Sequence, residues 1–97
     1  MIKHIVTFKL KGSHAQRRQA AENFKEALMA LPEKIECLKS MEVGLNCNPA
    51  EDWDVVLTAL VDNMEDLAVY ANHPLHLAAA AIIKDCKESR ACVDYLV

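Results

Sequence analysis

A tyrosine and a histidine that could move a proton together lie close to each other in the segment 70–76, which reads YANHPLH. Pro74 suits the first position of a helix, because its missing N–H has no intrahelical partner there and its φ angle is already helical. His76 then lies in the first helical turn, where the positive end of the helix dipole disfavours a protonated imidazole. A neutral imidazole beside Tyr70 could take a proton alpha to a carbonyl while the phenol donates to the enolate oxygen. The same two side chains could instead be polar groups that complete a core.

The other histidines support weaker interpretations. His4 lies in an apolar row of a predicted strand, where a core histidine with a backbone partner is the structural alternative to a site residue. His73 comes just before the predicted helix and is expected to cap it or to face solvent. A metal site built from these two histidines, His76 and Asp94 is not predicted, because His73 lies outside the helix and no third ligand has a recognisable spacing.

The cysteines carry no ligand pattern. They contain no Cys-x-x-Cys motif, and their spacings match no standard zinc site. We expect them to stay reduced and to behave as small buried hydrophobic residues. They are Cys37, Cys47, Cys86 and Cys92.

Charge and hydropathy narrow the classes of partner. The length of 97 residues fits one domain, residues 1–97, and a hydrophobic share of 53% indicates a packed globular chain. A net charge of −3 without a run of Lys and Arg predicts neither a nucleic acid nor a membrane surface as partner. No signal-peptide core or bilayer-spanning run is found, so a soluble cytoplasmic protein is expected. No glycine-rich phosphate loop occurs, and no cofactor is predicted.

Alternation and capping signals predict the elements that must position Tyr70 and His76. Residues 2–10 alternate as a strand that puts His4 in its apolar row. Ser13 to Gln16 is typical of a capping box, and the helix that it opens ends before Pro32. Strands are further predicted over 41–47, 53–61 and 90–97, and helices from 63 to about 70 and from 74 to about 87.

This order of elements predicts a fold and an assembly. The sequence β-α-β-β-α-β is that of the ferredoxin-like α+β fold, in which the helices cover one face of an antiparallel sheet. The predicted strands carry enough apolar residues for both faces. A bare apolar face favours a second copy as its partner. We therefore expect a homodimer whose two sheets meet through their open faces as a barrel.

Four segments together resemble the stress-responsive A/B barrel (Dabb) domain family. They are the opening MIKHIV (1–6), the segment EDLAVY (65–70), the NHPLH motif (72–76) and the ending ESRACVDY (88–95). The resemblance covers essentially the whole chain and implies a dimeric α+β barrel, in agreement with the order of elements. The family's functions are diverse. One plant member, olivetolic acid cyclase, closes a polyketide by aldol condensation with a tyrosine and a histidine in a cleft between helices and sheet.

The resemblance implies site residues for this chain. Tyr70 and His76 correspond to the catalytic pair of the cyclase. Val55 stands where that enzyme has a further cleft histidine, which argues against identical chemistry and substrate. The positions that correspond to the ligand pocket are His4, Val6, Phe8, Phe24, Leu28, Cys92 and Asp94.

Two functions follow as hypotheses. The first is a homodimeric binding module whose small hydrophobic cleft takes an apolar carbonyl-type ligand. The second is a cofactor-independent enzyme of the cyclase or lyase type that uses Tyr70 and His76 as an acid–base pair. Both hypotheses need the same cleft, and only the second needs proton transfer.

Overall fold

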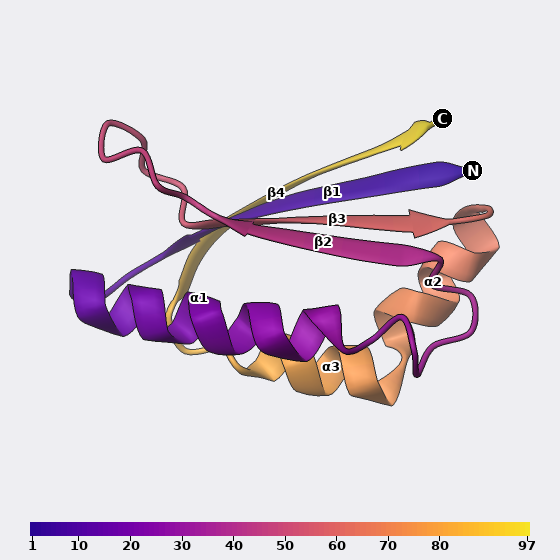
Figure 1. Cartoon of the computed structure of the whole chain (residues 1–97), viewed down its shortest axis with the longest axis horizontal. Helices are drawn as coiled ribbons and strands as arrows, with labels where there is room; N and C mark the ends of the chain where they lie inside the picture. The colour runs from indigo at the N-terminus through magenta and orange to yellow at the C-terminus, as the bar shows by residue number, and fades with distance from the viewer.

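One antiparallel sheet with helices packed on a single face makes up the structure, a computed structural model that describes residues 1–97 (Figure 1). The elements are β1 (Ile2–Leu10), α1 (His14–Met29), β2 (Ser40–Leu45), β3 (Val55–Val61), α2 (Met64–Asn72), α3 (Pro74–Ala81) and β4 (Lys87–Leu96). The strands lie in the order β2-β3-β1-β4, and each neighbouring pair is antiparallel. The predicted ferredoxin-like arrangement is therefore confirmed.

The central strand β1 sorts its residues onto two faces by alternation, as predicted. Its odd-numbered interior residues are half-buried on the uncovered face of the sheet. His4 lies directly opposite Ala59 of β3 on one side and Asp94 of β4 on the other. Residues paired across strands point to the same face, so His4 and Asp94 both face the helix layer. The buried residues of β1 are Ile2, His4, Val6, Phe8 and Leu10.

Helix α1 begins at the predicted capping box. The Ser13 hydroxyl accepts from the Gln16 N–H at 3.1 Å, and the Gln16 side chain accepts from the Ser13 N–H at 2.9 Å. The helix buries Ala21, Phe24 and Leu28, which helical spacing puts on one face. The ring of Phe24 meets that of Phe8 edge to face, with centroids 5.3 Å apart, and this contact fixes α1 over β1.

Asp54 joins the start of α1 to the end of the sheet. One carboxylate oxygen accepts from the Leu10 N–H at 2.7 Å, and the other accepts from the Arg17 guanidinium at 3.1 Å. The Asp54 N–H donates to the Phe8 carbonyl at 2.9 Å. These bonds hold the first turns of α1 at a fixed distance from β1.

The helical segment between β3 and β4 is divided into two helices at His73. Asn63 caps α2 by accepting from the Asp66 N–H at 2.8 Å. His73 ends α2 and caps α3 through its Nδ1, which accepts from the Leu75 N–H at 3.1 Å, so the expected capping role is confirmed. The prediction that this helix extends to about residue 87 is wrong, because α3 ends at Ala81. Residues 82–86 form turns with bonds to the third preceding carbonyl, which let Ile83 point into the core.

Three strands also differ in their bounds from the prediction. The second and third strands cover 40–45 and 55–61, so Cys47 and Trp53 lie in the loop between them and are exposed. Side chains of Asn46 and Asn48 bond the backbone of this loop, which projects beyond the sheet (Figure 1). The last strand begins at Lys87, three residues before the prediction, because its pairing with β1 continues to Leu10.

The expectation that the cysteines are buried is wrong in part. Cys47 is exposed in the projecting loop, whereas the other three are partly buried, and all four are free thiols. The error at Cys47 arises because the predicted strand 41–47 continues two residues beyond the end of β2 at Leu45. Alternation along that longer strand would have placed the Cys47 side chain on the buried face.

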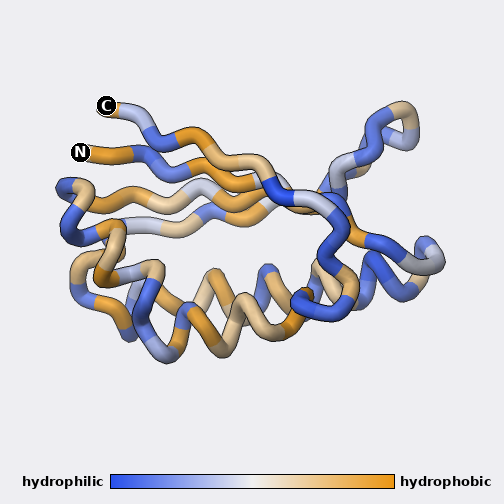
Figure 2. Tube along the Cα trace, turned by 180° about the vertical axis from the view of Figure 1, so that it is seen from behind, coloured by the Kyte–Doolittle hydropathy of each residue, from blue (hydrophilic) through white to orange (hydrophobic).

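The second face of the sheet has no helix over it, as the fold predicts (Figure 1). It carries apolar residues of several strands, and apolar segments run through all four strands in Figure 2. Val93 is 61% exposed and Tyr95 41% exposed on this face. None of the helices has the length and apolarity needed to cross a membrane.

Candidate functional site

A cavity of about 220 Å³ lies between the sheet and the helices. Its walls come from β1, β3 and the start of β4 on the sheet side and from α1, α2 and α3 on the helix side. The polar side chains that line it are His4, Tyr70, His76, Lys87 and Arg90. The apolar lining consists of Val6, Phe8, Phe24, Leu57, Leu67, Ala71, Ala80 and Ile83. The volume is below the range of about 300–1,000 Å³ of pockets for drug-sized molecules, so a ligand here would be small.

Tyr70 sits at the inner wall of this cavity. The residue is fully buried, and its hydroxyl is a buried polar atom with no hydrogen-bond partner in the protein. Burial raises the pKa of its phenol well above the ordinary value, so the group keeps its proton. A protonated hydroxyl without a partner is available to donate to a ligand oxygen, and its burial without a partner costs stability.

His76 packs against Tyr70, with ring centroids 4.5 Å apart. Its Nδ1 lies 2.9 Å from the Ala71 carbonyl. A carbonyl can only accept, so Nδ1 carries the proton and Nε2 keeps a free lone pair. Burial lowers the pKa of His76, and the Ala71 bond, which favours the charged form, opposes this only in part. The histidine is therefore a neutral imidazole whose free nitrogen can accept a proton.

His4 completes a row of three rings, because it meets Tyr70 edge to face with centroids 6.2 Å apart. Its Nδ1 is held by the Asp94 carboxylate, and the Cys92 thiol lies 3.5 Å from the same nitrogen. The carboxylate fixes the orientation of this imidazole from the strand beside it. Burial raises the pKa of the Cys92 thiol, with the Asp94 charge acting in the same direction, so the thiol stays protonated and is a poor nucleophile.

A cluster on β1 and β4 has side chains of the types that bind zinc or a similar ion, namely His4, Cys92 and Asp94. The ligand atoms of His4, Cys92 and Asp94 all lie within 4.8 Å of one another. The contacts among the three groups also account for the cluster without an ion. His73 lies apart from it, because that imidazole caps α3, and the four-residue set considered from the sequence does not assemble.

The residues named from the sequence fall into three positions. Tyr70 and His76 face one another at the cavity, and His4, Val6, Phe8 and Phe24 line it with them. Cys92 and Asp94 do not line the cavity and instead contact His4 from β4. Leu28 is fully buried in the core and does not reach the cavity, because it lies one helical turn beyond Phe24.

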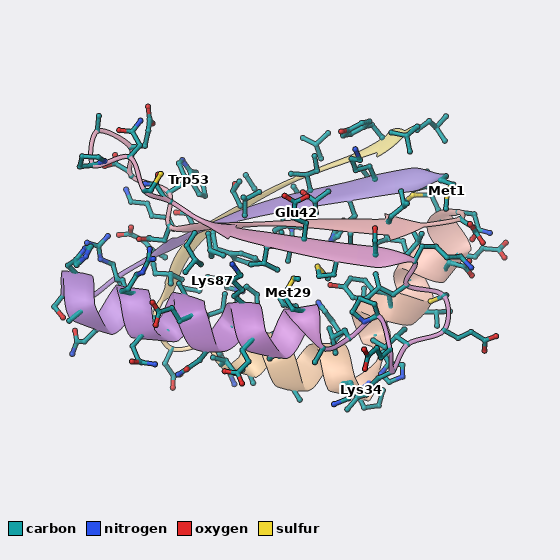
Figure 3. The ribbon with its side chains drawn as sticks, viewed as in Figure 1. Met1, Met29, Lys34, Glu42, Trp53 and Lys87 are labelled. Atoms are coloured by element: carbon teal, nitrogen blue, oxygen red, sulfur yellow. The ribbon has the colours of Figure 1, made fainter.

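Two cationic side chains of the cavity were missed. Lys87 and Arg90 belong to the first residues of β4, and sequence patterns assigned Arg90 only to a strand start. In Figure 3 the labelled Lys87 lies between the sheet and the helix layer. The pairing register of β4 with β1 would have revealed that Lys87 lines the cavity. Alternation within β4 alone does not determine this register.

Comparison with known proteins agrees with this fold. A model of the stress responsive A/B barrel (Dabb) domain matches residues 2–97. A dimeric protein of unknown function with a ferredoxin-like fold from Bacteroides fragilis is 48% identical, with a TM-score of 0.94 over 97% of this chain and 93% of that chain. A dimeric ferredoxin-like protein of unknown function from Thermobifida fusca is 29% identical, with a TM-score of 0.80 over 99% and 90% of the two chains. An uncharacterized protein of Streptomyces coelicolor is 30% identical over 86 residues, 88% of this chain and 89% of that protein.

Proposed function

The chain belongs to the stress responsive A/B barrel (Dabb) domain family, and from this premise we propose that its helix–sheet cleft binds a small apolar carbonyl compound. One observation carries the proposal. The same apolar cavity is lined by Tyr70, whose buried hydroxyl has no protein partner, and by His76, a neutral imidazole with a free Nε2.

The chemistry of these two groups selects the class of ligand. A ligand carbonyl accepts from the Tyr70 hydroxyl and satisfies a donor that is otherwise buried without a partner. The apolar walls then cover the hydrocarbon part of the molecule, which contributes about 25 cal/mol for each Å² removed from water. Few polar groups among many apolar ones is the usual composition of a small-molecule site.

A titration with 2-heptanone tests the binding. We expect NMR signals of the cavity residues to shift and saturate, while signals from the projecting loop stay in place. Ala80→Phe fills the cavity from α3 and should abolish the shifts. Ala78→Phe is the matched control, because Ala78 is an exposed alanine of the same helix outside the cavity. Unmoved cavity signals, or binding that survives Ala80→Phe, would contradict the proposal.

A second function is favoured by the state of His76. The Ala71 bond leaves Nε2 as the basic atom, and the lowered pKa keeps it unprotonated near neutral pH. We propose as the alternative that the protein is a cofactor-independent enzyme of the cyclase or lyase type. The C–H bond alpha to the ligand carbonyl breaks, the proton goes to Nε2, and the electron pair forms an enolate whose oxygen accepts from the Tyr70 hydroxyl.

Exchange of alpha-protons in D₂O distinguishes the enzyme from the binding module. Proton NMR of 2-heptanone should show faster loss of the alpha signal with the protein than in buffer. Tyr70→Phe and His76→Ala should each lower this rate by on the order of 100-fold. His14→Ala changes an exposed histidine outside the cavity and should leave the rate unchanged. Binding without any acceleration would favour the module.

The open sheet face supports a proposal about assembly. The Bacteroides fragilis and Thermobifida fusca proteins are both described as dimeric. In this chain the uncovered face carries exposed Val93 and Tyr95, and a hollow of about 570 Å³ is lined in part by Trp53. Trp53 is labelled at the base of the projecting loop in Figure 3. We propose that a second copy covers this face, because apolar side chains on a sheet face need a partner to leave water.

A further inference from the structure

Two cations line the mouth of the cleft, and no carboxylate lines it with them. Lys87 and Arg90 are both exposed residues of β4, and the rest of the lining consists of two histidines, Tyr70 and apolar side chains. Neither side chain makes an ion pair in the protein. The nearest acidic side chain on this face of β4, Asp94, is held by His4. The cleft therefore has a positive mouth above an apolar interior.

A bulge in the sheet brings both cations to the same face. Phe8 pairs with Arg90, and Lys9 pairs with Ser89, so a regular ladder would pair Leu10 with Glu88. The register shifts between Lys9 and Leu10, and Leu10 pairs with Lys87 instead. Because strand side chains alternate, residues 87 and 90 share a face only when one extra residue is inserted between them.

The bulge also removes an acidic side chain from the cleft. In the regular register Glu88, two residues from Arg90 along the strand, would lie on the same face as Arg90. Its carboxylate would then offset the charge of the Arg90 guanidinium. In the structure Glu88 lies 3.7 Å from Lys9, a residue of the opposite face of β1. One inserted residue thus exchanges a carboxylate for an ammonium group at the cleft mouth. Bulges are known to re-aim side chains beside functional sites.

From this arrangement, and resting on the proposed function, we infer that the carbonyl ligand of the cleft carries an anionic group, most simply a carboxylate, which Arg90 and Lys87 bind at the mouth. The guanidinium of Arg90 can bond both oxygens of a carboxylate, and the Lys87 ammonium adds a point charge. The apolar body of the ligand lies inward, with its carbonyl at Tyr70. The ligand class is therefore a small keto acid rather than a neutral ketone.

A pair of probes that differ only in charge tests this inference. The probes are 6-oxoheptanoate and 6-oxoheptanamide, which share the ketone, the chain length and the terminal carbonyl. Their affinities are measured by the same NMR titration with the intact protein at one salt concentration. We expect the acid to bind about tenfold tighter than the amide, the lower end for charge-assisted bonds, because both cations are solvent-exposed.

The variants locate the effect. In Arg90→Gln and in Lys87→Gln the preference for the acid should fall, and in the double variant it should approach one, with the affinity for the amide unchanged. Lys84→Gln is the matched control, because Lys84 is an exposed lysine outside the cleft, and it should keep the full preference. The three replaced residues, Lys84, Lys87 and Arg90, are all exposed, so their replacement leaves the core intact.

Each outcome bears on a different statement. Equal binding of the two probes to the unchanged protein would overturn the anionic ligand and leave the proposed carbonyl cleft standing. A preference that survives the double variant would overturn the role of Arg90 and Lys87. If neither probe moves the cavity signals while 2-heptanone does, this inference fails and the proposed function stands. If 2-heptanone also leaves these signals in place, the proposed function fails, and this inference fails with it.

Discussion

Replacing Tyr70 with phenylalanine should stabilise the fold while weakening the proposed function. The hydroxyl is buried without a partner in the protein, and a buried polar group left unsatisfied costs about 1–3 kcal/mol. Phenylalanine keeps the ring and its packing against His76. We expect a gain of about 1 kcal/mol in the free energy of unfolding, the lower end of the range, because the space left by the oxygen forfeits some packing contacts.

Urea and thermal denaturation at one protein concentration measure this gain. For a domain of this size, about 1 kcal/mol corresponds to a rise of about 4–8 °C in the melting temperature. Tyr95→Phe is the matched control when both variants are measured at a protein concentration low enough for the chain to be monomeric. Tyr95 is then 41% exposed on the opposite face of the sheet, and the stability of this variant should change by no more than about 0.5 kcal/mol. Destabilisation of Tyr70→Phe by 1 kcal/mol or more would refute the reasoning, since it would mean that the hydroxyl is satisfied in the fold.

Three further variants test the other parts of the account. Burial holds the pKa of His76 below that of the unfolded chain, so the unfolded state binds a proton more readily and the free energy of unfolding should fall as the pH drops below about 6.5. His76→Gln should remove this part of the pH dependence, and an unchanged profile in urea denaturation would contradict the assignment. Val93→Asp adds a charge to the open sheet face and should weaken the dimer by at least tenfold in sedimentation equilibrium, whereas Val69→Asp, at a similarly exposed valine of α2, should not. A dimer that withstands Val93→Asp would place the interface elsewhere. Asp54→Ala removes the acceptor of two hydrogen bonds and should cost about 1–3 kcal/mol in urea denaturation, whereas Asp52→Ala in the exposed loop should cost almost nothing; equal effects would show that the anchor contributes little.

Local patterns were sufficient where one element decides its own shape. Alternation in β1 put His4 on the buried face, and the pair of Ser13 and Gln16 marked the start of α1, because capping depends on neighbours in sequence. The His73-Pro74 step marked the boundary of α2 and α3 for the same reason. These local signals, combined with the order of the elements, were enough to predict the ferredoxin-like fold.

Features that depend on partners distant in sequence were not predictable. No glycine or proline marks the end of α3 at Ala81 in the sequence. The helix ends there because Ile83 packs into the core. The exchange of Glu88 for Lys87 at the cleft mouth is decided by a bulge in the pairing of β4 with β1. A period-two pattern within β4 gives the opposite answer, since a one-residue shift reverses the face of every side chain beyond it.

The crystal structure of the protein with 6-oxoheptanoate is the measurement that tests the central claim most directly. The account predicts that the ketone oxygen lies within hydrogen-bond distance of the Tyr70 hydroxyl, with the alpha carbon facing the free nitrogen of His76. The carboxylate should lie at Arg90 and Lys87. Density for the probe outside this cavity, or a cavity that stays empty at saturating probe while the protein binds it in solution, would contradict the account.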